Sequence, residues 1–364
     1  MSETIISSVP SSQPGLSVGQ TAPAVNYLDH WKAGFREIRT FSGHSQGLWV
    51  VTFSPDGETL ASAGVDRLIR IWDIETGRLL KSLRGHTRDI RAILYTPDGQ
   101  NLITASEDRT IRMWNPKTGE PTKLLFSRYD HNVVSLSLSP DGLMLARGSH
   151  NKDIKIWEVT TGTELMTLLG KDQYDHHWSV CVAFSPDGMQ LASGNDIGKI
   201  RVWEVLPNGE EKLAHNGHWQ QDMEDSTETR GYFIDDDGGF QQAMDFWIGA
   251  MVFTPDGKTL ISGSRDKLIK VWEFPAMNEI RTLKGHSAWV RSLVVSPDGR
   301  TLISAGDDSA IKFWDLETGR QFRSVKAHQE GVRGLAFSPD GRQLASVGWD
   351  RNVKLWEGGE PPAE

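Results

Sequence analysis

The chain has 364 residues, 38% of them hydrophobic, and carries a formal net charge of −9 at pH 7. This acidic balance argues against nucleic acid and anionic membranes as partners, because both repel a negative protein. No apolar stretch approaches the roughly 18–20 residues that span a bilayer. The single cysteine, Cys181, excludes a disulfide framework within the chain and lies in an apolar run that predicts a buried thiol. We therefore expect a cytoplasmic protein.

The two ends of the chain differ in composition from the rest. Residues 1–26 are rich in serine, proline and glycine, which predicts a disordered tail, and residues 358–364 predict a flexible tail for the same reason. Directly after the first tail, Tyr27, Leu28 and Trp31 predict a short amphipathic turn that packs on the following strand.

Between these tails, a short apolar run ends in tryptophan seven times. The seven residues are Trp72, Trp114, Trp157, Trp203, Trp272, Trp314 and Trp356, and the gaps between them are 42, 43, 46, 69, 42 and 42 residues. An internal repeat of about this length is typical of β-propeller blades.

Each repeat also contains a Ser/Thr-Pro-Asp-Gly segment. The prolines of these segments are Pro55, Pro97, Pro140, Pro186, Pro255, Pro297 and Pro339. Proline presets the first turn position and glycine supplies the positive φ, so each segment predicts a turn between two antiparallel strands. A second turn follows several of the tryptophans, as at residues 75–77, and adds a fourth strand to the unit.

These features resemble the WD-repeat family over roughly residues 35–357. Gly-His opens most units, an aspartate lies six residues before the terminal tryptophan, and Trp-Asp occurs at Trp72-Asp73 and Trp314-Asp315. The resemblance implies an all-β fold, a single seven-bladed propeller of four-stranded antiparallel blades, which we assign to residues 27–357. The regular turns are similar to those of bacterial members. Because no fourth strand follows Trp356, we expect residues 35–41 to complete the last blade and close the ring.

Five units contain histidine, serine or threonine, and aspartate, the residue types of an acyl-transfer triad. In the first unit these are His44, Ser62 and Asp66. The other sets are His86, Thr104 and Asp108; His218, Ser262 and Asp266; His286, Ser304 and Asp308; and His328, Ser346 and Asp350. Since an enzyme needs one site and the pattern recurs five times, we interpret each set as a buried chain of hydrogen bonds that runs from the tryptophan N–H to aspartate, as the resemblance implies.

The third and fourth units break this pattern. Arg147 and Asn151 replace the serine and aspartate of the third unit, and Ile197 replaces the aspartate of the fourth. Both units also lack the opening Gly-His pair. We expect these blades to be less rigid or to be modified for a partner.

In WD-repeat proteins, one face of the ring is lined by three residues of each unit: those seven and five positions before the Ser/Thr-Pro-Asp-Gly turn, and the one directly before the turn aspartate. Carried over to this chain, the charged or tryptophan positions are Trp49, Asp89, Arg91, Glu107, Trp178, Asp196, Trp247, Arg265, Trp289, Arg291, Asp307, Arg333 and Trp349. Tryptophan and arginine are enriched in binding hot spots. We predict that this set binds a partner; the alternative is that some tryptophans plug the mouth of the channel.

The 69-residue gap places an insertion at about residues 219–245 of the fifth unit. It holds eight acidic residues and one arginine, and its aromatic residues flank Asp236-Asp237-Gly238-Gly239, which predicts a hairpin. We expect a partly ordered lid over the same face. The acidic run 235–237 lacks the alternating ligand spacing of a calcium loop.

The sequence predicts a non-catalytic interaction scaffold or adaptor that binds a peptide or protein within a multiprotein complex. We expect a monomeric propeller without cofactor or metal. The alternative is a small-molecule or metal-sensing propeller, or an enzyme with its site at the channel mouth. The non-repeated candidates for such a site, which are His150, Asp196, Glu107, Asp307 and His176-His177, are scattered over the units.

Overall fold

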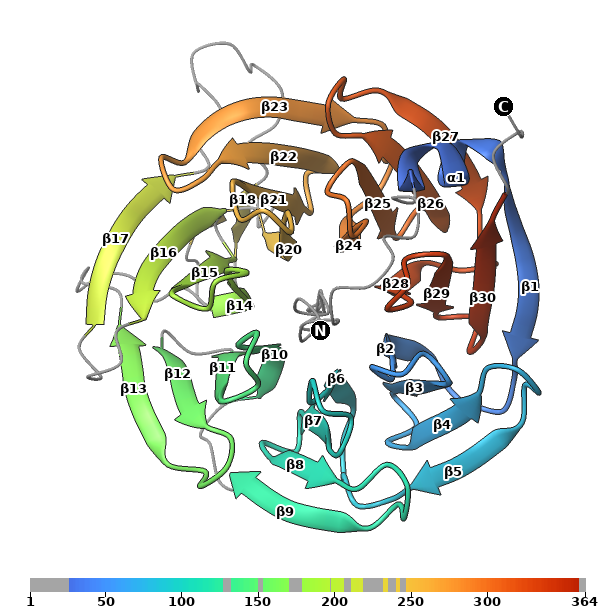
Figure 1. The fold of residues 1–364 in the computed structure, drawn as a ribbon. Coiled ribbons are helices and arrows are strands. Elements are labelled where there is room, and N and C mark those ends of the chain that lie inside the picture. The colour runs from blue at the N-terminus through green and yellow to red at the C-terminus, as the bar shows by residue number, and fades with distance from the viewer. Residues whose placement is uncertain are drawn as a thin grey trace, which may run out of the picture.

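The computed structural model describes residues 26–126, 132–149, 153–169, 179–196, 198–205, 211–218, 232–234, 240–242 and 247–359. Figure 1 shows seven blades arranged around a central axis. In six blades the strands pair antiparallel in chain order with the first strand nearest the axis, and in the seventh the outermost strand is β1 from the start of the chain. The seven-bladed fold predicted from the repeat is therefore confirmed.

The strands divide among the blades as follows. Blade 1 consists of β2 (Leu48–Phe53), β3 (Thr59–Gly64), β4 (Ile69–Asp73) and β5 (Leu79–Leu83). Blade 2 consists of β6 (Ile90–Tyr95), β7 (Leu102–Ser106), β8 (Ile111–Trp114) and β9 (Pro121–Phe126). Blade 3 consists of β10 (Val133–Leu138), β11 (Met144–Ser149), β12 (Asp153–Glu158) and β13 (Glu164–Leu169). Blade 4 consists of β14 (Ser179–Phe184), β15 (Gln190–Asn195), β16 (Lys199–Val205) and β17 (Glu211–His218).

The remaining blades follow a short hairpin of β18 (Tyr232–Ile234) and β19 (Phe240–Gln242). Blade 5 consists of β20 (Ile248–Phe253), β21 (Thr259–Ser264), β22 (Leu268–Glu273) and β23 (Asn278–Lys284). Blade 6 consists of β24 (Val290–Val295), β25 (Thr301–Gly306), β26 (Ala310–Asp315) and β27 (Gln321–Lys326). Blade 7 consists of β28 (Val332–Phe337), β29 (Gln343–Gly348), β30 (Val353–Gly358) and β1 (Phe35–Phe41).

The Ser/Thr-Pro-Asp-Gly turns form one face of the ring, called here the turn face. In blade 1 the Ser54 hydroxyl accepts the Thr59 N–H at 2.9 Å, and Gly57 has a φ of 75°. A Cβ added at Gly57 would lie 3.6 Å from Cδ of Pro339, and one at Gly99 would lie 3.6 Å from Cδ of Pro55. Each turn thus packs on the proline of its neighbour, and the contact between blades 1 and 7 continues this ring of turns across the closure.

The ring closes through β1, which pairs antiparallel with β30 from Phe35↔Gly358 to Phe41↔Val353. Lys354 and Glu37 form an ion pair across these strands at 2.7 Å. This pairing confirms the expected closure of the last blade by residues 35–41. Gly358 belongs to β30, so the blade extends beyond the boundary at 357 assigned from the sequence.

The helix α1 (Tyr27–Ala33) precedes β1 and packs on blades 6 and 7 (Figure 1). The Trp31 side chain is fully buried, with ring centroids 5.8 Å from Phe313 and 5.7 Å from Phe337. The Tyr27 hydroxyl donates to the Asp340 carbonyl at 2.9 Å. The predicted packed turn is therefore a helix capped by Asn26, whose side chain accepts the Asp29 N–H at 3.3 Å. Residues 1–25 and 360–364, which hold most of the predicted tails, lie outside the described residues.

Candidate partner-binding face

The groups that resemble a catalytic triad form the same hydrogen-bond network in blades 1, 2, 6 and 7. In blade 1, His44 Nδ1 lies 2.8 Å from Asp66, His44 Nε2 lies 2.8 Å from the Ser62 hydroxyl, and Trp72 Nε1 donates to that hydroxyl at 2.8 Å. The equivalent distances in the other three blades are 2.7–2.8 Å; these networks comprise His86, Thr104, Asp108 and Trp114; His286, Ser304, Asp308 and Trp314; and His328, Ser346, Asp350 and Trp356.

These four networks are structural. The serine or threonine at the centre of each has an exposed fraction of 0%, so no substrate can reach it. Burial alone raises the pKa of each network carboxyl, but the hydrogen bond and charge interaction with histidine, together with backbone N–H donors, hold that pKa below its ordinary value. An ionised aspartate therefore accepts the Nδ1–H, and Nε2 accepts the hydroxyl proton.

In blade 5, Trp272 Nε1 donates to Ser262 at 2.8 Å, whereas the side chain of His218 lies outside the described residues. Blade 3 replaces the network with a buried arginine: Arg147 lies 3.6 Å from Asp153 and 5.7 Å from the centre of the Trp157 ring. In blade 4 the Trp203 N–H still reaches a serine hydroxyl, that of Ser193, at 3.0 Å. Blades 3 and 4 are also joined directly, since Ser149 of β11 pairs with Ser179 of β14. Asn151 and Ile197, which break the repeat, lie outside the described residues.

The described members of the predicted binding set lie at the strand ends opposite the turns, on the face called here the loop face. Across blades 2, 1 and 7 they form one cluster. The Arg91 guanidinium stacks over Trp49 at 3.7 Å and its Nε donates to Glu107 at 2.8 Å. Trp49 Nε1 donates to Asp89 at 3.4 Å, and its ring meets Trp349 edge-on with centroids 4.9 Å apart.

A second cluster continues across blades 7, 6 and 5. Asp307 accepts from Arg291 at 2.7 Å and pairs with Arg333 at 3.0 Å. Arg291 stacks over Trp289 at 3.4 Å. The Trp289 ring packs against Trp247 of blade 5 with centroids 5.3 Å apart, and the Arg265 guanidinium lies 5.4 Å from Trp289. Because Arg333 also lies 5.2 Å from the Trp49 ring, the two clusters form one arc, called here the Trp/Arg belt.

Most of the belt is buried. The exposed fraction is 3% for Trp247, 4% for Trp49 and 9% for Trp289, and the arginines Arg91, Arg291 and Arg333 are also buried. Trp349 is half-buried, and Arg265 is the belt residue that is exposed. The belt therefore links neighbouring blades through cation–π and ion-pair contacts, and a partner would meet mainly its outer groups.

Two glycines carried over to this face make room for tryptophan. A Cβ added at Gly47 would lie 2.0 Å from Cε3 of Trp349, and one at Gly249 would lie 2.8 Å from Nε1 of Trp289. The indole rings thus pack directly on the backbone of the neighbouring blade, which explains why these positions hold no side chain.

The other predicted positions lie in blades 3 and 4. Asp196 follows β15 and is buried. Trp178, His150 and His176-His177 lie outside the described residues. Cys181 is buried, and burial raises the pKa of its thiol to about 12, in agreement with an inert cysteine.

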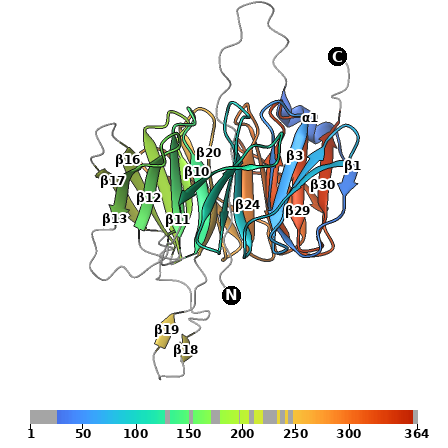
Figure 2. The same ribbon diagram turned by 90° about the horizontal axis from the view of Figure 1, so that it is seen from below.

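The insertion connects β17 of blade 4 to β20 of blade 5, and Figure 2 shows β18 and β19 on the side toward which β1 runs, which is the side of the loop face. β18 pairs antiparallel with β19, from Tyr232↔Gln242 to Ile234↔Phe240. The predicted hairpin is therefore confirmed. Residues 219–231, 235–239 and 243–246 of the insertion lie outside the described residues, so the predicted lid stays a prediction.

A further group of basic residues on the loop face was not predicted. The residue after the turn aspartate has positive φ in several blades, and it is basic at Arg67 (65°), Arg109 (66°), Lys267 (76°) and Arg351 (67°). All four side chains are exposed. The recurring Asp-Arg or Asp-Lys pair was visible in the sequence, but it could be read as part of the repeat's turn.

Within the described residues, no group of three or more His, Cys, Asp and Glu side chains is arranged to hold a metal ion. In the same part of the chain, no helix is long and apolar enough to cross a membrane.

The blades, their closure and their tryptophan networks define a β-propeller built from WD40 repeats. Residues 242–273, 277–315 and 319–357 match the family described as WD domain, G-beta repeat, and residues 47–225 match the family described as IFT122 first beta-propeller.

Curated proteins are similar to this chain over short segments. Eukaryotic translation initiation factor 3 subunit I of Phaeosphaeria nodorum is 44% identical over 43 residues, that of Neurospora crassa 42% over 45, and that of Aspergillus niger 36% over 51. These segments cover 12–14% of this chain and 13–15% of each relative's length. The relatives named here are fungal, and the similarity to bacterial members stays a prediction.

Proposed function

We propose that this chain is a non-catalytic scaffold that binds a peptide or protein partner on its loop face, within a multiprotein complex. Two findings support the proposal. Its WD40 propeller is a fold used widely for protein interaction, and the relatives that it resembles in part are named as subunits of a translation initiation factor. We further propose that it acts in the cytoplasm, as a monomeric propeller and without a cofactor.

The observation that carries this proposal is the contrast between the two sets of polar groups. The serine or threonine hydroxyl that would act in acyl transfer is fully buried in each of the five sets, at Ser62, Thr104, Ser262, Ser304 and Ser346. The loop face instead presents the exposed guanidinium of Arg265 and the half-buried side chains of Trp349, Glu107 and Asp307, which are groups that suit recognition of a partner.

The alternative, a small-molecule or metal-sensing site or an enzyme site at the channel mouth, has less support. Glu107 and Asp307, two of its candidate acids, accept hydrogen bonds from Arg91 and Arg291. Each of these carboxylates is thus already bound by an arginine, which leaves its oxygens less available to a substrate or a metal ion.

The test is affinity capture from the native host with the full chain and two charge-reversal variants. Arg265→Glu changes an exposed residue of the loop face, whereas Lys258→Glu changes an exposed residue on the turn face of the same blade. We expect Arg265→Glu to lower the recovery of specific partners about fivefold or more, because reversing a charge in an interface introduces repulsion. Lys258→Glu should leave recovery unchanged.

Equal recovery with all three proteins would refute the proposed binding face. Trp289 and Arg291 are unsuitable for this test because both are buried, and their removal would alter folding together with binding.

A further inference from the structure

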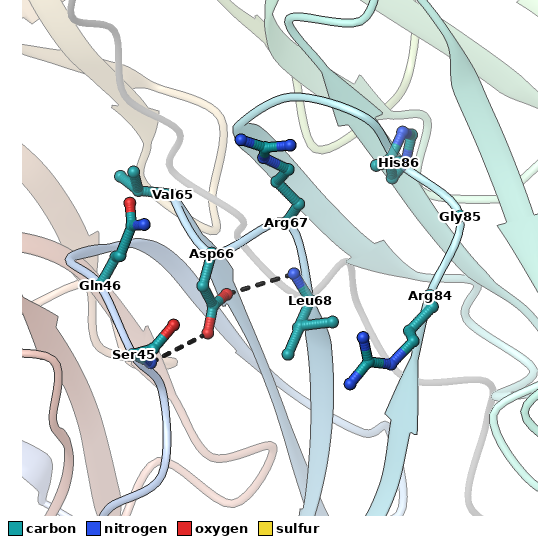
Figure 3. Close-up of a pocket in the computed structure, with 9 residues that line it drawn as sticks. All are labelled: Ser45, Gln46, Val65, Asp66, Arg67, Leu68, Arg84, Gly85 and His86. Atoms are coloured by element: carbon teal, nitrogen blue, oxygen red, sulfur yellow. Dashed lines mark hydrogen bonds between the residues drawn. The ribbon is translucent and has the colours of Figure 1, made fainter.

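A polar hollow lies on the loop face between blades 1 and 2 (Figure 3). Its volume is about 310 Å³, at the lower end of the range for ligand sites. Blade 1 contributes Ser45 and the segment from Val65 to Leu68, and the connection into blade 2 contributes Arg84 and His86. The hollow is therefore built from two neighbouring repeats, and none of the residues that line it belongs to the Trp/Arg belt.

The carboxylate that lines this hollow, that of Asp66, already accepts hydrogen bonds from its own blade. Asp66 accepts from His44 at 2.8 Å, from the Ser45 N–H at 3.2 Å and from the Leu68 N–H at 3.2 Å, and its side chain is almost fully buried. The Asp66 oxygens are therefore bonded within blade 1 and do not pair with Arg67 or Arg84.

Arg67 and Arg84 are both exposed. Within the part of the chain that the structure describes, neither guanidinium makes a hydrogen bond or an ion pair. Arg67 has a φ of 65°, a conformation that costs an L-residue roughly 1 kcal/mol and glycine almost nothing. Blade 4 has Gly198, with a φ of 82°, at the equivalent position, so the turn itself does not require an arginine. The side chain of Arg67 is thus available for recognition.

Two exposed arginines, Arg67 and Arg84, line the hollow and form its basic rim, although the whole chain is acidic. Five exposed arginines of blades 7, 1 and 2, which make no ion pair within the described residues, lie on the connections of this face: Arg351, Arg67, Arg84, Arg88 and Arg109. Guanidinium groups bind carboxylates through paired hydrogen bonds. A partner for this rim must therefore carry several negative charges close together.

The surroundings favour a peptide over a nucleic acid. No tryptophan, tyrosine or phenylalanine lines the hollow, and the nearby Trp72 and Trp114 are buried, so the hollow lacks the exposed aromatic rings on which single-stranded bases usually stack.

We propose that the hollow between blades 1 and 2 binds an acidic segment of the protein partner, rich in aspartate and glutamate, with Arg67 and Arg84 as its carboxylate-binding residues. This inference rests on the proposed scaffold function and names the chemistry of the partner.

The test measures binding of a fluorescent decapeptide rich in Asp and Glu to the full chain by anisotropy. The variants are Arg67→Gly, which keeps the turn conformation, and Arg84→Gln. Lys267→Gly is the matched control, since Lys267 has the same positive φ and charge on the same face but lies in blade 5. Each arginine variant should weaken binding about three- to tenfold, and the control should change it less than twofold. Raising the salt concentration should weaken wild-type binding.

Three results would overturn the proposal. An equal loss of peptide binding in Lys267→Gly would show that binding depends only on the overall positive charge of the loop face. Unchanged binding in both arginine variants, or tighter binding of a single-stranded RNA of equal charge, would also refute it. Partner capture separates this proposal from the scaffold function. If Arg265→Glu abolishes capture and Arg67→Gly changes neither capture nor peptide binding, the hollow proposal fails and the scaffold proposal stands.

Discussion

Replacing Ser346 by alanine in blade 7 tests whether the tryptophan networks hold the blades together. The Ser346 hydroxyl accepts the Trp356 N–H and bonds His328 Nε2, both at 2.8 Å. Its removal leaves two buried polar groups without partners, each at a cost of ~1–3 kcal/mol. We expect a loss of about 3 kcal/mol in the free energy of unfolding.

Ser193→Ala in blade 4 is the matched control, because it removes the same atoms. The Ser193 hydroxyl accepts only the Trp203 N–H among the described residues, so one group loses its partner and the expected loss is about 1.5 kcal/mol.

The assay is calorimetric melting together with urea unfolding. For a propeller of about 330 residues, an unfolding entropy of ~2.1 cal/mol/K per residue gives ~0.7 kcal/mol/K in total, so Tm should fall by about 4 °C for Ser346→Ala and about 2 °C for Ser193→Ala. An equal decrease in stability in the two variants, or no decrease in Ser346→Ala, would refute the idea that the hydrogen bond between Ser346 and His328 stabilises the blade.

Other predictions follow from packing and charge. Trp31→Ala should destabilise the protein by about 3–5 kcal/mol in urea unfolding, because the indole is fully buried between α1 and blades 6 and 7; a loss below 1 kcal/mol would contradict that packing. Gly47→Ala should cost about 1–3 kcal/mol and change tryptophan fluorescence, since its Cβ meets Trp349; the cost should largely disappear in a Trp349→Ala background, and purely additive losses would argue against the clash. Since folding lowers the pKa of Asp66 and Asp350, their stabilisation is complete above the unfolded value of ~3.9 and is lost as the pH falls through the lower folded values. The urea concentration at which half of the protein is unfolded should therefore decrease as the pH falls below about 4, and this decrease should be smaller in Asp350→Asn. An equal decrease in the variant would refute the stabilising role given to Asp350.

The fold could be predicted from the sequence because its determinants repeat. The turn at residues 54–59 and the network of His44, Ser62 and Trp72 recur with the same spacing, and one blade therefore explains the others. The strand at residues 35–41 could be assigned to the last blade for the same reason, since the repeat shows that this blade lacks a fourth strand.

The contacts between blades could not be predicted in the same way. Trp49 belongs to blade 1 and its cation, Arg91, to blade 2, and no spacing rule says which groups meet once the ring has closed. The partner of Arg147 was also hidden, because Asp153 lies outside the repeated pattern. The burial of the Trp/Arg belt depends on such pairs, and the residues proposed from the sequence as a binding surface are for this reason largely interior.

The described ends of the propeller lie side by side. The Gly359 N–H donates to the His30 carbonyl at 3.1 Å, and a Cβ added at Gly34 would lie 2.9 Å from Cα of Gly359. A short linker between these points would yield a circularly permuted chain whose new termini could be opened in another blade. The helix α1 and the end of β30 lie on the side of the ring away from the loop face (Figure 2). A fluorophore attached at Asn26 or Gly359 would therefore be carried on the side opposite the loop face.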